Sequence, residues 1–166
     1  GRVPAVDLDG QVMFESGAIL DYLAETRAPQ FWRAPGHPDR ARYLEWLHFA
    51  ETMAAHLANL TQQHIVLRED HMRSPTVMRL EAKRLENCLI AAALARQGAG
   101  IAGEFCAADV ALGYGLLIAR HFLRLDHPAL QDWDAALMAR PAYRAALAAD
   151  GSPQIYVNEF YGLPDV

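Results

Sequence analysis

Residues 3–19 read VPAVDLDGQVMFESGAI, and this stretch decides how the chain begins to fold. Residues 3–8 and 11–14 are two short runs of β-type composition, and Asp9 and Gly10 lie between them. An Asp-Gly pair in this position is typical of a type I′ turn, because both central residues of that turn need a positive φ. The stretch therefore predicts an antiparallel hairpin.

A short helix is expected directly after the hairpin. Ile19, Tyr22 and Leu23 recur at helical spacing, and Ser16 lies near the predicted start. Residues 27–38 then carry three prolines and a glycine, a composition that predicts a linker between two different parts of the chain.

The rest of the chain is predicted to be helical. Apolar stripes follow residues 39 to about 66 and residues 75 to about 97, and residues 106 to about 125 are apolar on most sides, which favours a central helix. Two shorter helices are expected near 129–139 and 142–149, separated by Arg140-Pro141. The expected division is residues 1–26, a linker over 27–38, a helical part over 39–150 and a tail over 151–166.

Composition excludes several classes of function. The 166 residues include 15 Lys and Arg against 20 Asp and Glu, a formal charge of −5, and no basic run marks a nucleic-acid partner. No apolar run reaches the ~18 to 20 residues of a membrane span. The two cysteines, Cys88 and Cys106, lack C-x-x-C spacing, which indicates a reducing, cytoplasmic setting.

The order of elements and three motifs resemble the soluble glutathione transferases, in a bacterial form. The motifs are GRVPAV at 1–6 with ESGAI at 15–19, GEFCAADV at 103–110 and, more weakly, ARPAY at 139–143. The resemblance implies a mostly α fold, in which residues 1–26 are the C-terminal part of a thioredoxin-like domain and residues 39–150 an all-α domain. It also implies glutathione as co-substrate and a homodimer.

The resemblance implies a glutathione-binding role for Val3, Pro4, Glu15 and Ser16. The Val3-Pro4 bond would be cis and the backbone of Val3 would pair with glutathione, whereas a plain edge strand would carry a trans proline. Ser16 would bond the γ-glutamyl carboxylate and Glu15 the ammonium group. The alternative for this pair is an ordinary N-cap serine beside a solvated glutamate.

Cys106 and Asp109 resemble the family's capping box at the start of the central helix, in which Asp109 bonds back to the N–H of the cap residue. Cysteine replaces the usual hydroxyl residue, and sulfur is a weak acceptor, so we expect a poorer forward bond. This pair concerns folding. A nucleophilic Cys106 is not favoured, because no base lies beside it in the sequence.

By the same resemblance, the helix over 39–66 would line a pocket for a small hydrophobic electrophile, with candidates His48, Phe49, Met53 and His56. Residues of such a stripe are more often core, so no more than two of the four are expected to line it. Tyr156, Phe160 and Tyr161 either cap this pocket or pack on the surface. The seven histidines do not align at ligand spacing, and no metal is expected.

The residue that activates the glutathione thiol in this family is expected before Gly1. The parent enzyme would conjugate glutathione to small electrophiles or use it as a reductant. Two alternatives stay open: a non-catalytic transferase-like module that binds a protein partner, and an unrelated helical scaffold.

Overall fold

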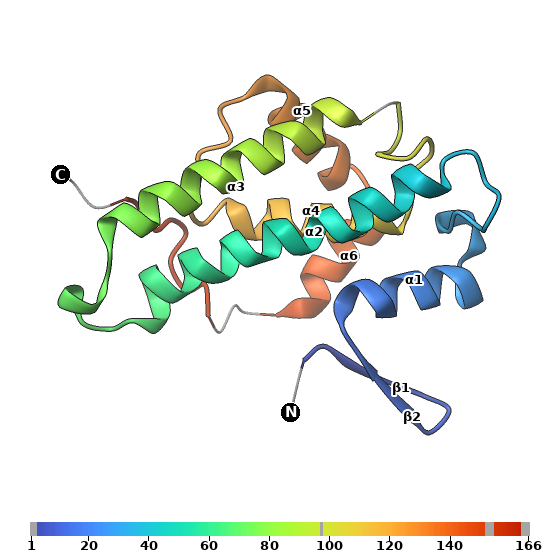
Figure 1. The fold of residues 1–166 in the computed structure, drawn as a ribbon, viewed down its shortest axis with the longest axis horizontal. Helices are drawn as coiled ribbons and strands as arrows, with labels where there is room; N and C mark the ends of the chain where they lie inside the picture. The colour runs from blue at the N-terminus through green and yellow to red at the C-terminus, as the bar shows by residue number, and fades with distance from the viewer. Residues whose placement is uncertain (1–2, 97, 152–154, 164–166) are drawn as a thin grey trace. The chain divides into compact units, whose positions relative to one another are not determined.

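The computed structural model describes residues 3–96, 98–151 and 155–163. The hairpin strands β1 (Ala5–Leu8) and β2 (Gln11–Phe14) lead into α1 (Ser16–Arg27), as Figure 1 shows. The helices that follow are the short η1 (Pro29–Phe31), α2 (Arg40–Thr61) with its π-helical continuation η2 (Gln62–Val66), η3 (Asp70–Met72), α3 (Pro75–Ala95), α4 (Ala107–Ala119), α5 (Pro128–Met138) and α6 (Pro141–Asp150). The predicted fold class, a β-hairpin with a helix followed by an all-α part, is confirmed.

The predicted hairpin forms around the Asp-Gly pair. Ala5 pairs with Phe14 and Leu8 with Gln11, and Asp9 and Gly10 have φ values of 54° and 91°. The Gly10 N–H also donates to Oδ1 of Asp7 over 2.7 Å. This turn is therefore determined locally by its own residues.

Tertiary contacts divide the chain into two compact units. Unit 1 comprises the described residues of 1–52 and 95–114, and unit 2 those of 53–94 and 115–166. The division at residues 26 and 38 stays a prediction. The helix predicted to begin at residue 75 was expected to end near Gln97, which lies outside the described residues. Within the described part of the chain, no helix combines the length and the apolar character that crossing a membrane requires.

In unit 1, two arginines bind the backbone of the loop between α3 and α4. Arg33 is buried, and it donates to the carbonyl oxygens of Ala102 (3.1 Å) and Glu104 (2.5 Å). Arg42 donates to the carbonyl oxygens of Ile101 and Ala95. The predicted linker over 27–38 thus contains a buried guanidinium group, that of Arg33, which donates hydrogen bonds to carbonyl oxygens of the loop.

Asp109 organises the same loop from the other side. Its side chain is 1% exposed and accepts from the backbone N–H groups of Cys106 and Ile101, each over 2.9 Å. The Cys106 thiol donates to Oδ2 of Asp109 over 3.3 Å, while the Asp109 N–H bonds to the Cys106 carbonyl. Burial, followed by the charge of Asp109, raises the pKa of this thiol to about 11, so it stays protonated and acts as a donor.

Helix α4 ends earlier than predicted, at Ala119 and not near Leu125. The N–H groups of His121 and Phe122 bond to the carbonyls of Ile118 and Ala119, three residues back, which tightens the last turn. Periodicity did not show this end, because the apolar residues Phe122, Leu123 and Leu125 continue beyond it.

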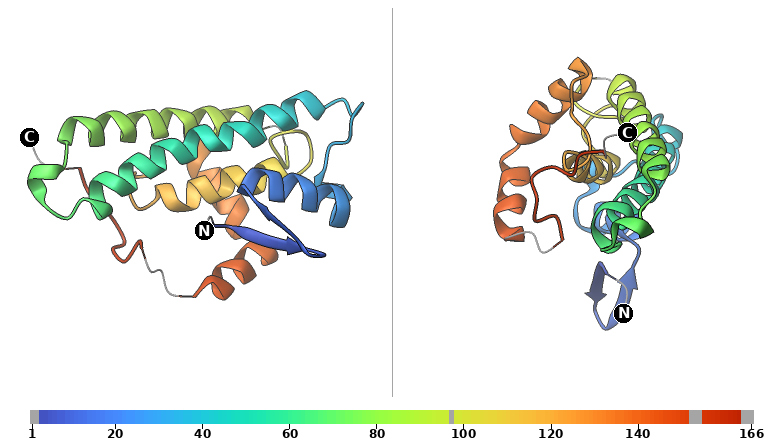
Figure 2. Two further views of the ribbon diagram at one scale, coloured as in Figure 1. Left: turned by 60° about the horizontal axis from the view of Figure 1, so that its bottom comes forward. Right: turned by 90° about the vertical axis from the view of Figure 1, so that its left-hand side faces the viewer.

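In unit 2, Tyr156 of the tail packs on protein side chains. The Tyr156 hydroxyl lies 3.0 Å from the Thr61 hydroxyl, and its ring stacks on His121 with centroids 5.0 Å apart. The predicted break between α5 and α6 is also present, with Pro141 as the first residue of α6 (Figure 2). Residues 152–154 and 164–166 of the predicted tail lie outside the described residues.

We predict that Asp109→Ala lowers the free energy of unfolding by about 2–4 kcal/mol, because two buried N–H groups lose their acceptor. Asp109→Asn keeps one acceptor oxygen and should lose less. Urea denaturation measures both, with the exposed Asp132→Asn as control. A loss below about 0.5 kcal/mol for the alanine variant would contradict the assigned role.

Candidate functional site

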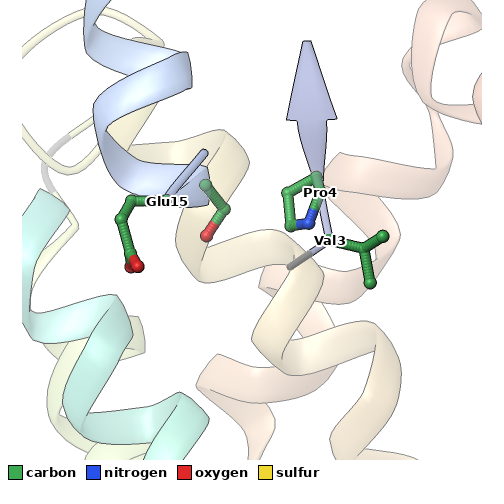
Figure 3. A pocket seen from close by; sticks show the side chains of 4 residues that line it. Val3, Pro4 and Glu15 are labelled. Atoms are coloured by element: carbon green, nitrogen blue, oxygen red, sulfur yellow. The ribbon is translucent and has the colours of Figure 1, made fainter. Parts of the chain in front are cut away.

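A pocket of about 250 Å³ opens in unit 1 and is lined by Val3, Pro4, Glu15 and Ser16. Val3 and Pro4 precede β1, whereas Glu15 and Ser16 form the junction between β2 and α1. In Figure 3, Glu15 stands on one side of the pocket and Val3 and Pro4 on the other. The hairpin therefore brings together two segments that are eleven or more residues apart in sequence.

The backbone at both segments has an unusual conformation. The Val3-Pro4 peptide bond is cis, as the resemblance implied. Glu15 has a φ of 77°, in the left-handed region that favours glycine. A residue other than glycine held there costs about 1–3 kcal/mol, and such residues cluster at binding sites.

The start of α1 leaves room for an anionic ligand. Glu15 is the N-cap residue of α1 and makes no side-chain cap bond. Ser16 is the first residue of the helix, so it is not the N-cap serine that the sequence offered as an alternative. The unbonded N–H groups of a first turn, together with the helix dipole, favour negative charge at this end. The Ser16 hydroxyl adds another donor.

Carboxylates lie beside this positive helix end. Glu15 lines the pocket itself, and a Cβ built on Gly17 would lie 3.5 Å from Oε1 of Glu51, which comes from α2. Donors for an anion and acceptors for a cation thus lie within one turn of α1. The arrangement suits a ligand with a carboxylate and an ammonium group on the same carbon, as in a free amino-acid end.

The structure separates the four residues of α2 that were candidates for an electrophile pocket. His48 is exposed, and Phe49 packs edge-to-face on Trp46 with centroids 4.9 Å apart. Met53 is 0% exposed, and a Cβ on Gly115 would lie 2.6 Å from its Cε. Met53 is therefore a core residue and is unavailable to a co-substrate.

The fourth candidate, His56, belongs to a polar cluster around the buried Glu81, which the sequence did not predict. Its Nδ1 lies 2.7 Å from Oε2 of Glu81, which is 5% exposed and also accepts from Asn59 (3.2 Å) and Arg84 (2.5 Å). Burial raises the pKa of Glu81, but the hydrogen bonds from His56, Asn59 and Arg84 outweigh it and leave the pKa below 4.5. The cluster ties α2 to α3 within unit 2.

In the parts of the chain that the structure describes, no three His, Cys, Asp or Glu side chains gather as metal ligands. The candidate site is the pocket before β1, lined by Val3, Pro4, Glu15 and Ser16.

A solved structure identifies the family. It is the theta class glutathione S-transferase of the citrus canker pathogen Xanthomonas axonopodis pv. citri with glutathione bound, 30% identical to this chain. The match covers 84% of this chain and 75% of that one, with a TM-score of 0.68. The chain belongs to the glutathione transferase family.

Two further solved structures share the fold. A glutathione S-transferase from Actinobacillus pleuropneumoniae is 19% identical over 98% of this chain and 76% of that one, with a TM-score of 0.73. Ure2p5 from Phanerochaete chrysosporium is 21% identical over 85% of this chain and 70% of that one, with a TM-score of 0.69. No protein-family model and no curated protein sequence matches the chain.

The roles of Val3, Pro4, Glu15 and Ser16 toward glutathione stay predictions. In the structure, these four residues line a single pocket.

The lowered pKa of Glu81 predicts a pH dependence of stability. A carboxyl group whose folded pKa is depressed stabilises the fold above its ordinary pKa of 4.5, and this contribution is lost as the pH falls through the folded pKa. The difference in unfolding free energy between the unmodified chain and Glu81→Gln should be constant near pH 7 and shrink below about pH 4.5. Urea titrations at several pH values measure it, and a difference that grows on acidification would contradict the assignment.

Proposed function

We propose that this chain binds glutathione in the pocket before β1, as the glutathione-holding part of a transferase. The N-terminal end of α1 and the Ser16 hydroxyl bind the γ-glutamyl carboxylate, and the Glu15 carboxylate binds the ammonium group. The exposed backbone at Val3 pairs with the peptide backbone of the ligand.

One observation carries this proposal: the residues that the resemblance selects, drawn from two separate segments, line one pocket. Their chemistry also matches the ligand, since donors for an anion and a carboxylate for a cation lie at one helix end. The Xanthomonas enzyme was crystallised with glutathione, and the Phanerochaete protein with 1-(S-glutathionyl)-2,4-dinitrobenzene, the conjugate of glutathione and an aromatic electrophile.

The proposed reaction is attack of the glutathione thiolate on a small hydrophobic electrophile, or use of the thiol as a reductant. The residues described above would hold and orient glutathione by its γ-glutamyl end, which places its thiol at a fixed position for the reaction. We also propose that the protein acts as a homodimer.

The test compares the binding of the two dipeptides that make up glutathione, γ-glutamylcysteine and cysteinylglycine. We expect glutathione and γ-glutamylcysteine to bind the chain in calorimetric titration, and cysteinylglycine, which lacks the γ-glutamyl group, to bind at least tenfold more weakly, about 1.4 kcal/mol. Ser16→Ala should weaken glutathione about fivefold to twentyfold, since a hydrogen bond to a charged group is lost.

Thr26→Ala provides a matched control on the same helix, because the Thr26 hydroxyl bonds only within α1, to the Tyr22 carbonyl. Its glutathione affinity should equal that of the unmodified chain. Equal binding of the two dipeptides would contradict the proposed orientation. No glutathione binding at millimolar concentration would favour the alternative of a non-catalytic interaction module.

A further inference from the structure

A second polar cluster in unit 1 converges on Asp21, in the middle of α1. Oδ1 of Asp21 accepts from Nε1 of Trp32 over 3.0 Å and from the Tyr43 hydroxyl over 2.8 Å. Nη1 of Arg40 lies 3.8 Å from the same oxygen. Trp32 follows η1, whereas Arg40 and Tyr43 belong to the first turn of α2, so one carboxylate oxygen joins α1 to two other segments.

The partners of Asp21 are themselves held in place. The Arg40 guanidinium lies over the rings of Trp32 and Tyr43, 5.6 and 5.4 Å from their centroids. It also donates to the Arg33 carbonyl over 2.9 Å. Tyr43 is fully buried, and this burial, followed by the hydrogen bond to Asp21, raises the pKa of its hydroxyl. The hydroxyl therefore remains a donor at neutral pH.

Two side chains of α1 are fully buried, Ile19 and Ala24, 7% and 3% exposed, and Leu20 and Leu23 are half-buried. Apolar burial is not directional, so it fixes the rotation of a helix about its axis less strictly than hydrogen bonds do. The two hydrogen bonds to Asp21 are directional in this way.

Asp21 and Ser16 occupy different sides of α1. At 3.6 residues per turn, a separation of five residues places them about 140° apart around the helix axis. Rotation of α1 about this axis would move the Ser16 hydroxyl and the first-turn N–H groups away from Val3 and Pro4. The orientation fixed at Asp21 therefore determines where the donors of the pocket point.

We propose that Asp21 is a positioning residue for the pocket before β1. Through Tyr43 and Trp32, it holds α1 at the rotation in which Ser16 and Glu15 face the γ-glutamyl end of the ligand. This inference rests on the proposed function, because the ligand whose binding it governs is glutathione.

The decisive experiment is a double-mutant cycle between Asp21 and Ser16, read as the glutathione dissociation constant. We expect Asp21→Ala to weaken binding about tenfold in the unmodified chain. In a Ser16→Ala background the loss should be clearly smaller, about threefold, because one of the donors that Asp21 positions is already absent while the first-turn N–H groups and Glu15 remain. Asp21→Asn keeps an acceptor oxygen for Tyr43 and Trp32 and should stay within about twofold of the unmodified chain.

Glu81→Ala is the matched control for stability. It removes a carboxylate that, like Asp21, accepts several hydrogen bonds, but within unit 2. It should lower the unfolding midpoint without changing glutathione affinity. If Asp21→Ala does not fold, Tyr43→Phe and Trp32→Phe each remove one donor and should each weaken binding about threefold.

The outcomes separate the two proposals. Absence of glutathione binding by the unmodified chain overturns the proposed function and this inference with it. Normal binding by the unmodified chain together with unchanged affinity of Asp21→Ala, or an equal loss in both Ser16 backgrounds, overturns the role of Asp21 alone.

Discussion

The β2–α1 junction is made by one residue, Glu15, whose backbone lies in the left-handed region with a φ of 77°. This conformation turns the chain from an extended strand directly into a helix, with no loop between them. It places the first turn of α1 beside the segment that precedes β1, so that Ser16 and Pro4 line the same pocket. The backbone cost of a non-glycine residue there is offset by the rest of unit 1, which holds both elements.

Buried and half-buried polar side chains, joined to their neighbours by hydrogen bonds, hold unit 1 together. Arg33 and Asp109 bind the backbone of the loop before α4, one as donor and the other as acceptor. Asp21 accepts hydrogen bonds from Trp32, which follows η1, and from Tyr43 of α2. Because an unpaired buried polar group is costly, these contacts make the arrangement of the elements specific. Because α1 is one of these elements, the same contacts fix where the pocket residues Glu15 and Ser16 lie.

Features set by local residues were predictable from the sequence. The Asp9-Gly10 turn and the start of α6 at Pro141 follow from backbone preferences of a few residues. The residues of the pocket were predictable only through the resemblance of their motifs, since neither Val-Pro nor Glu-Ser by itself indicates a ligand.

Features that depend on which helix faces meet were not predictable. His56 was a pocket candidate because of its place on α2, and its pairing with Glu81 depends on the packing of α3. Arg33 lies in a proline-rich segment that favours exposure, yet it is buried by its hydrogen bonds to loop carbonyls. Met53 is a core residue that packs closely against Gly115, and this contact joins distant parts of the sequence.

The most direct test is a crystal structure of this chain grown with saturating glutathione. We expect the γ-glutamyl carboxylate within hydrogen-bond distance of the Ser16 hydroxyl and the first-turn N–H groups of α1. We also expect the ammonium group beside Glu15 and the ligand backbone along Val3. Glutathione bound elsewhere with this pocket empty, or bound here with its glycine end at Ser16, would contradict this binding mode.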